Sequence, residues 1–195
     1  MQKQYDISNS IYFLGRMLHY STHWSQKILL KYELEHLENY IKLQKIILGD
    51  RLNVFVNVGA ETQNCFVIKL ILQPLVENSI VHGMIGKNNL NIDVKISIEN
   101  QLLLIEIFDD GVGISADELK LIQSSMQENN CFYGEIKPDS LRIRMSGIGL
   151  NNINERIRLT YGHEYGIIIE SEKNVYTKVT AVLPVEKTIE GMRET

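Results

Sequence analysis

Hydrophobic residues change their spacing along the chain, and each change predicts a change of element. In the first 48 residues apolar side chains recur at steps of three and four: Ile7, Ile11, Leu14 and Leu18, then Leu30, Leu34, Leu37, Ile41 and Leu48. This spacing places each set on one side of a helix. We therefore predict two helices that pack on each other or on a partner, the second ending at Gly49-Asp50.

Beyond residue 50 the apolar positions alternate, which is typical of strands. Alternation covers 52–58, 92–98 and 102–108, and two further strands flank a turn at residues 172–174 and end at "VTAVLP". Helices are predicted around Pro74, at 117–128 and over "NNINERIRLTYG", while "NNCFYGEIKPDS" is predicted to be irregular. The predicted order is two helices followed by β-α-β-β-α-loop-α-β-β. It favours the α+β class: an α/β sandwich with a mixed, mostly antiparallel sheet covered on one face by helices.

Composition narrows the functional class only slightly. The chain has 195 residues, is 44% hydrophobic and carries a formal net charge of −4. These values fit an ordinary globular domain and argue against a general nucleic-acid binder, which needs a basic face. Cys65 and Cys131 are far apart and are expected to be free thiols. No apolar run approaches the roughly 18 residues that span a bilayer, so we expect no membrane contact by this segment.

Three short stretches carry the candidate chemistry. The first is "LILQPLVENSIVHG", an apolar helix interrupted by Glu77, Asn78 and His82. Asn78 and His82 are four residues apart and share a helix face. The Asn78 amide oxygen is the kind of ligand that Mg²⁺ takes alongside phosphates and water. We expect this polar edge to line a nucleotide pocket.

The second stretch is "IFDDGVGIS", in which a strand runs directly into Asp109 and then Gly111 and Gly113. The Asp109 carboxylate only accepts hydrogen bonds, so it suits the amino group of adenine and disfavours guanine. Glycines at alternate positions permit backbone angles that other residues resist and let a flat ring approach the main chain. A glycine-rich turn capped by aspartate is the competing interpretation of this stretch alone.

The third stretch is "SGIGLNNINERI", where Gly147 and Gly149 precede a helix predicted to begin near Leu150. Backbone N–H groups at a helix start bind anions such as phosphate. Arg142 and Arg144 precede the glycines and either contact phosphates or lie on a solvated face.

Taken in order, the three stretches resemble the N, G1 and G2 boxes of the GHKL (Bergerat-fold) ATPases, which include histidine kinases, gyrase-type enzymes and Hsp90-type chaperones. "LEHLENYIKLQKIILGDRL" followed by "LILQPLVENSIVHG" looks like the catalytic region of LytS/YesM-type sensor histidine kinases of two-component systems. The resemblance runs from about Leu14 to Pro184. It implies the Bergerat fold, ATP and Mg²⁺ as cofactors, and transfer of the γ-phosphoryl group to a histidine.

The resemblance also implies roles for individual residues. Asn78 would hold Mg²⁺, Asp109 would bind adenine, and Glu77 would orient or deprotonate the acceptor histidine. The ATP-binding set it implies is Asn78, His82, Asp109, Gly111, Gly113, Ile114, Gly147, Gly149, Leu150 and Thr177. Residues 115–146 would form a lid over the nucleotide.

The chain departs from the family pattern in several places. It has no Asn-Pro-His-Phe acceptor motif, and neither His19 nor His23 stands in that context. Val81, Asp110 and Tyr176 replace residues more usual in the boxes. Two alternatives therefore stay open: an ATPase that hydrolyses ATP with Glu77 as base, and a non-catalytic dimerising or regulatory module.

These considerations divide the chain into three parts. Residues 1–48 would be a remnant of the dimerisation and phosphoacceptor region, 49–186 the ATP-binding catalytic domain and 187–195 a tail. The resemblance implies a cytoplasmic position within a membrane-bound sensor, a homodimer formed through the N-terminal helices of the parent, and a response-regulator aspartate as the final acceptor. The sequence identifies neither the signal nor the cognate regulator.

Overall fold

The main element of the fold is a five-stranded sheet. The computed structural model describes residues 26–127 and 140–187, and of residues 140–148 only the backbone. The strand order is β2-β4-β5-β7-β6, formed by Leu52–Val58, Leu90–Glu99, Leu102–Asp109, Tyr176–Pro184 and Gly166–Glu172. β2 is parallel to β4, and every other neighbouring pair is antiparallel. The prediction of a mixed, mostly antiparallel sheet is confirmed.

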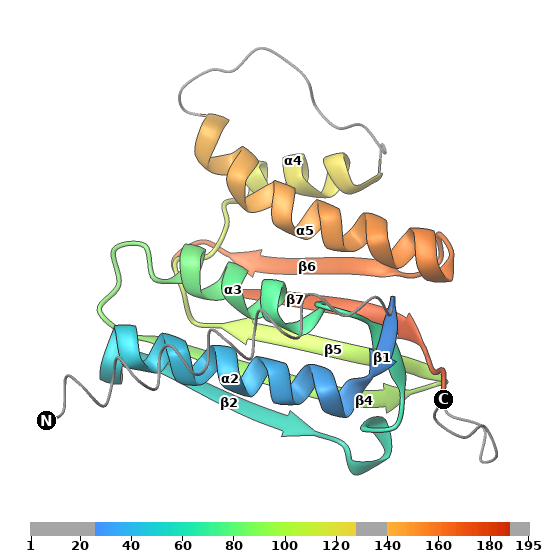
Figure 1. Cartoon of the computed structure of the whole chain (residues 1–195). Helices are drawn as coiled ribbons and strands as arrows, with labels where there is room; N and C mark the ends of the chain where they lie inside the picture. The colour runs from blue at the N-terminus through green and yellow to red at the C-terminus, as the bar shows by residue number, and fades with distance from the viewer. Residues whose placement is uncertain (1–25, 128–139, 188–195) are drawn as a thin grey trace, which may run out of the picture.

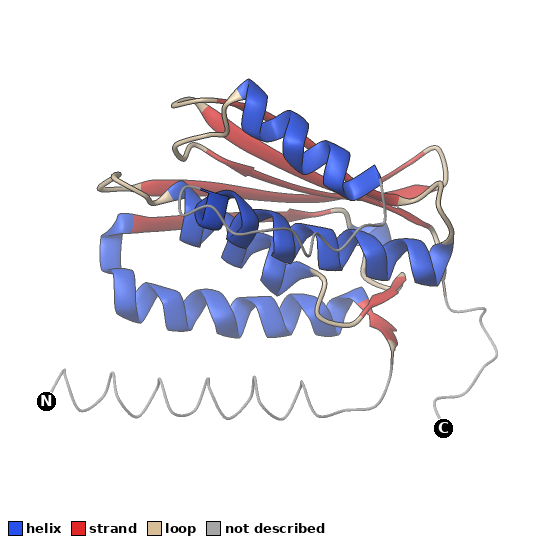
Figure 2. Cartoon of the chain, turned by 90° about the horizontal axis from the view of Figure 1, so that it is seen from above, coloured by secondary structure: helices blue, strands red, loops and turns tan. Residues whose placement is uncertain are grey.

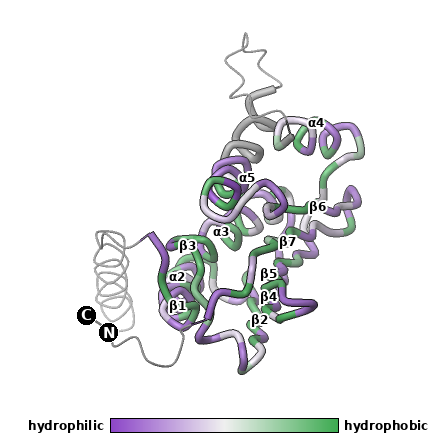
Figure 3. Tube along the Cα trace, turned by 90° about the vertical axis from the view of Figure 1, so that its right-hand side faces the viewer, coloured by the Kyte–Doolittle hydropathy of each residue, from purple (hydrophilic) through white to green (hydrophobic). Residues whose placement is uncertain are grey.

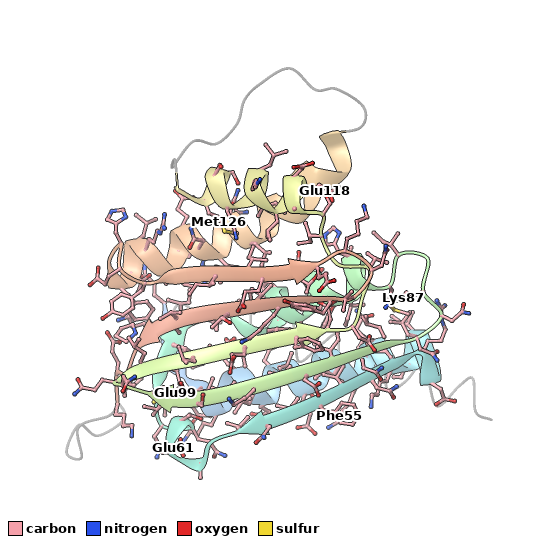
Figure 4. The ribbon with its side chains drawn as sticks, turned by 180° about the vertical axis from the view of Figure 1, so that it is seen from behind. Phe55, Glu61, Lys87, Glu99, Glu118 and Met126 are labelled. Atoms are coloured by element: carbon pink, nitrogen blue, oxygen red, sulfur yellow. The ribbon has the colours of Figure 1, made fainter. Side chains whose placement is uncertain are left out.

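Helices cover one face of this sheet. They are α2 (Leu30–Leu48), α3 (Leu72–Gly83) and α5 (Ser140–Tyr161), while α4 (Ala116–Gln127) lies beside α5 beyond the β6 edge. Figure 1 shows the three helices in front of the strands, and Figures 2 and 3 show the same two layers from other directions. The opposite face carries none of the described helices (Figure 4). The predicted α/β sandwich is therefore confirmed.

The core lies between these two layers. β4 alternates strictly between buried and exposed positions from Leu90 to Ile96, so a single face of the strand is covered. β5 and β7 supply the centre of the sheet layer, with Leu103, Ile105, Ile107, Val179, Ala181 and Leu183 all fully buried. The helices supply Leu37, Leu75 and Ile157, each at most 1% exposed. Burial of these apolar side chains is the main stabilising contribution to the fold.

The uncovered face carries a row of charges across four strands. Glu106 contacts Lys178 at 2.7 Å and Lys95 at 3.3 Å, and Lys178 also lies 3.8 Å from Glu170. The hydrogen bond from Lys178 is the largest cause of a lowered pKa at Glu106, and Lys95 adds to it. Exposed ion pairs contribute at most about 1 kcal/mol, so this row chiefly keeps the face hydrated.

A second, two-stranded sheet was not predicted. β1 (Lys27–Leu29) pairs antiparallel with β3 (Phe66–Ile68), with Lys27 opposite Ile68. Three-residue strands are too short to show a hydrophobic period, so the sequence gives no signal for them. Because β1 leads directly into α2 and β3 leads toward α3, the pairing places the starts of the two helices side by side.

Most predicted elements occur where expected. The hairpin turn at Glu99-Asn100-Gln101 is confirmed, with positive φ at Asn100 and Gln101. The predicted helix at 7–18 and nearly all of the irregular stretch before Ser140 lie outside the described residues. Val56 belongs to the apolar alternation of β2 but is 45% exposed, and β2 is an edge strand. It lines a groove of about 400 Å³ against α2.

The start of α5 corrects a prediction. The helix begins at Ser140 and not near Leu150, so Gly147 and Gly149 lie inside it. The residues before the glycines are good helix formers, and an interior glycine costs a helix only about 1 kcal/mol. Separately, none of the helices in the described ranges is long and apolar enough to cross a membrane.

Candidate functional site

Helix α3 presents one polar edge beside a buried apolar face. Its buried positions recur every three or four residues: Leu72, Leu75, Val76, Ser79, Ile80 and Gly83. This period leaves Glu77 exposed, whereas Asn78 and His82 are half-buried. The carboxylate that stands out in the apolar sequence is therefore solvated, and the amide and imidazole lie where the helix meets solvent.

Asn78 and His82 are open toward a ligand. Neither side chain forms a hydrogen bond with any of the residues that the structure describes. Burial lowers the pKa of His82, so its imidazole is neutral at pH 7. An amide oxygen and a neutral imidazole on one helix face can accept a metal–phosphate group without first breaking an internal contact.

Asp109, the last residue of β5, is the main titratable group of the site. Only 2% of its surface is exposed, and its Oδ1 accepts a hydrogen bond from the Gly111 N–H at 3.1 Å. Burial raises the pKa of Asp109 to about 6. The Ser79 hydroxyl faces it and lowers the pKa in part, although Ser79 Oγ makes no hydrogen bond of ordinary geometry to a described residue. Asp109 is thus mostly ionised at pH 7 with its charge poorly compensated.

Two glycines bring α3 against Asp109. A Cβ atom on Gly111 would lie 2.4 Å from the Gly83 Cα and 2.5 Å from Asp109 Oδ1. A Cβ atom on Gly83 would lie 3.1 Å from the same carboxylate oxygen. The end of α3 and the loop after β5 can approach this closely only because both positions lack side chains.

Gly113 meets a different part of the chain. Its φ is +61°, and a Cβ atom there would lie 2.0 Å from the Glu172 carbonyl oxygen. The same loop receives a hydrogen bond from Asn174 N–H to the Val112 carbonyl at 2.7 Å, and Ile114 N–H donates to Ser171 Oγ at 2.8 Å. Gly111 and Gly113 are therefore required for packing on their own chain. Their contact with a nucleotide stays a prediction.

Thr177 lies directly beside Asp109 on the neighbouring strand. The two residues are paired in the register of β5 and β7, so their side chains share a face. Thr177 is 8% exposed, and its Oγ1 lies 3.2 Å from Ser171 Oγ. The sheet therefore places Thr177 beside Asp109, and contact of Thr177 with a nucleotide stays a prediction.

Asp110 has a structural partner. Its two carboxylate oxygens accept hydrogen bonds from the backbone N–H and side-chain amide of Asn91, at 2.9 and 2.6 Å. Lys87 donates to the Asp110 carbonyl and lowers the pKa of Asp109. Figure 4 shows Lys87 in the loop between α3 and β4. Sequence reasoning missed Ser79, Lys87 and Asn91, which carry no motif of their own.

The start of α4 does carry a signal that was overlooked. Ser115 and Glu118 form a capping box: Ser115 N–H and Oγ donate to Glu118 Oε2, at 3.1 and 2.6 Å, and Glu118 N–H donates back to Ser115 Oγ at 3.4 Å. Figure 4 labels Glu118 near this end of the helix. The spacing S-x-x-E fixes where the loop after Gly113 ends.

The third predicted stretch differs most from expectation. Because α5 continues through Gly147 and Gly149, the predicted helix start at Leu150 is wrong. Binding of ATP by Gly147, Gly149 and Leu150 stays a prediction that no longer has a helix start to support it. Leu150 is 2% exposed and belongs to the core. The side chains of Arg142 and Arg144 lie outside the described residues.

No group of three or more His, Cys, Asp or Glu side chains in the described ranges could hold a metal ion. A site of Asn78 type requires no such group, because Mg²⁺ takes one or two protein oxygens and completes its shell with phosphate and water. The amide oxygen of Asn78 at the edge of α3 fits that ion.

Two family profiles match the chain. The sequence profile described as "Histidine kinase-, DNA gyrase B-, and HSP90-like ATPase" matches residues 66–187. The chain belongs to this family. A second profile, "Histidine kinase", matches residues 1–52.

Relatives and solved structures agree with this membership. The chain is 27% identical over 175 residues to the sensor protein kinase HptS of Staphylococcus aureus. The aligned region covers 89% of this chain and 31% of that protein. The chain thus spans about a third of the length of these curated relatives. The catalytic domain of histidine kinase ThkA superposes with TM-score 0.56 at 15% identity, covering 83% of this chain and 97% of that one. Acinetobacter baumannii histidine kinase AdeS superposes with TM-score 0.54 at 11% identity, and the match covers 91% of this chain and 76% of that one. Both confirm the fold.

Proposed function

We propose that this chain is the ATP-binding catalytic region of a sensor histidine kinase of the LytS/YesM type. It binds Mg·ATP and transfers the γ-phosphoryl group to a histidine that this chain does not supply, for relay to a response-regulator aspartate. The observation that carries the proposal is the buried Asp109 at the end of β5, with Ser79 and Gly83 of α3 packed against it and Asn78 open on the same helix.

Each residue has a part in this proposal. Asp109 accepts a hydrogen bond from the adenine amino group, and a guanine oxygen at that position would meet a carboxylate of like polarity. Asn78 holds Mg²⁺, which neutralises charge on the phosphates when it is bound. Glu77 is exposed, so an acceptor imidazole on another segment or chain can reach it and be oriented or deprotonated.

The wider setting follows from the family and is part of the same proposal. The kinase acts as a homodimer through the N-terminal helices of the parent protein, in the cytoplasmic portion of a membrane-bound sensor. A response regulator is its protein partner, and Mg²⁺ is the metal.

A calorimetric titration tests the proposal. Wild-type protein is titrated with Mg·ATP and Mg·GTP, and Asp109→Asn and Asn78→Ala are titrated with Mg·ATP. We expect binding of Mg·ATP, at least about tenfold weaker binding of Mg·GTP, and binding abolished in Asp109→Asn and weakened in Asn78→Ala. An absence of nucleotide binding by the wild type would support the non-catalytic module instead. Rapid ATP hydrolysis without an acceptor would favour the ATPase.

A further inference from the structure

Glu33 is a charged residue buried far from the motifs of the nucleotide site. It lies on α2 and is 0% exposed. Its carboxylate accepts three backbone hydrogen bonds from one short segment: Oε1 from Leu70 N–H at 2.7 Å, and Oε2 from Ile71 and Leu72 N–H at 3.0 and 3.3 Å. These N–H groups are at the start of α3, where a helix leaves its first donors without internal partners.

The start of α3 has no cap of its own. Ile71 is its N-cap residue and offers no side-chain acceptor, and Leu70 before it holds a positive φ of 56°. The carboxylate of Glu33 replaces the missing cap and places a negative charge at the positive end of the helix dipole. A second contact between the two helices lies nearby, where His36 Nε2 and Gln73 Oε1 are 2.6 Å apart.

The carbonyl groups of the same segment are held from the opposite side. Arg156 of α5 donates to the Lys69 carbonyl and, at 3.3 Å, to the Leu70 carbonyl. Glu33 of α2 thus binds the N–H groups of the turn that leads into α3, and Arg156 of α5 binds the carbonyl groups of the same turn. Asn78 follows six residues after Leu72, about 9 Å along the helix at 1.5 Å per residue.

We propose that Glu33 and Arg156 are positioning residues for the metal–phosphate end of the nucleotide site. They fix the direction of α3 and hence the place of Asn78, so that a displacement of α2 changes Mg·ATP binding. This inference rests on the proposed function. Asp109 belongs to β5 and is held by the sheet, whereas Asn78 is held only through α3, so we expect recognition of the base to depend on Glu33 less than metal binding does.

The test separates the two ends of the nucleotide. Dissociation constants for Mg·ATP and for ADP in EDTA are measured by calorimetry on the whole chain, at a temperature where circular dichroism shows each variant folded. Glu33→Gln keeps the size of the side chain but loses the charge and one acceptor. We expect Mg·ATP to bind roughly tenfold more weakly, a ratio equivalent to about 1.4 kcal/mol, and metal-free ADP to change less than about twofold.

Two controls and a second variant complete the design. Glu38→Gln removes an exposed carboxylate on the same helix, which pairs with Lys42, and should change neither constant. Arg156 is exposed, and Arg156→Gln should weaken the binding of Mg·ATP by about threefold while leaving the binding of ADP unchanged. The substitution Glu155→Gln, at the exposed neighbouring residue, is its control. If Glu33→Gln does not fold, the Arg156→Gln result decides whether the positioning role holds.

The possible outcomes distinguish a failure of the positioning role from a failure of the proposed function. Wild-type binding with unchanged constants in both variants, or an equal loss for both ligands, overturns the positioning role alone. A wild type that binds neither ligand overturns the proposed function and the inference with it.

Discussion

Asp109 combines a structural cost with a proposed function. A carboxylate that is 2% exposed, with its pKa raised to about 6, is less stable ionised in the folded chain than in water. Such poorly compensated groups concentrate at functional sites, because a ligand can supply the missing partner. Here a donor such as the adenine amino group would do so.

Asp109→Asn should therefore stabilise the fold while removing nucleotide binding. The pKa lies about 2 units above its ordinary value, so removing the charge should raise the free energy of unfolding at pH 7 by roughly 1–3 kcal/mol. Urea denaturation without nucleotide measures this change. A variant less stable than the wild type would contradict it, and Asp110→Asn, which loses an acceptor for Asn91, should be destabilised.

Nucleotide affinity should depend on pH through the same group. The adenine amino group prefers the ionised carboxylate, so affinity should be constant above about pH 7 and fall up to tenfold per unit below about 6. The contribution of Asp109 to the stability of the free protein runs the other way: this contribution to the free energy of unfolding should rise as the pH falls from about 6 to 3.8, and it is measured as the difference between the wild type and Asp109→Asn. Calorimetry from pH 5 to 8 checks the first statement, and equal affinity at pH 5 and 7 would refute it.

At the scale of elements, the origin of each helix start decides how well it could be predicted. α4 begins with a local capping box, Ser115 and Glu118, which lies within four residues of sequence. The segment that starts α3 is capped by Glu33, which lies 37 residues before Leu70, and no local sequence pattern reveals this contact. α5 begins at Ser140, before its two glycines, so the glycines do not mark a boundary.

A pair of glycine substitutions tests this account. Gly149→Ala should raise the free energy of unfolding by about 0.5–1 kcal/mol, because the position is helical and, apart from its own helical turn, no described residue has an atom within 4 Å of the added Cβ. Gly113→Ala should lower it by more than about 1 kcal/mol, because φ is +61° and the Cβ would meet the Glu172 carbonyl. Thermal and urea denaturation measure both. A destabilised Gly149→Ala would show that the residue is not in a helix.

At the scale of the whole molecule, α2 and the sheet share one core. Leu30, Leu37 and Tyr40 of α2 belong to the same buried cluster as the sheet residues, and Leu43 of the same helix is also buried. The predicted boundary between residues 48 and 49 stays a prediction. The packing of α2 favours a folding unit that begins earlier, near the first strand of the small sheet.

Two truncations separate these alternatives. A fragment of residues 26–195 should unfold cooperatively, and one of residues 49–195 should not. Loss of four buried side chains at roughly 1.5–3 kcal/mol each approaches the whole stability of a typical domain, and α3 also loses its cap. Calorimetric unfolding of both fragments is the measurement. A cooperative transition in the shorter one would place the boundary at residue 49.

Hydrophobic period and sequence motif were sufficient to predict a feature wherever its physical cause lies within a few residues of the chain. They determined the strands of the main sheet, the hairpin at Asn100, the course of α3 and the candidates Asn78 and Asp109, because alternation and helical spacing follow directly from which side chains leave water. Only the tertiary structure decided the contacts made across long separations. These are the Glu33 cap on α3, the approach of Gly83 to Gly111 and the contact of Gly113 with Glu172, and each depends on which distant backbone groups the packed core brings within hydrogen-bond or van der Waals distance.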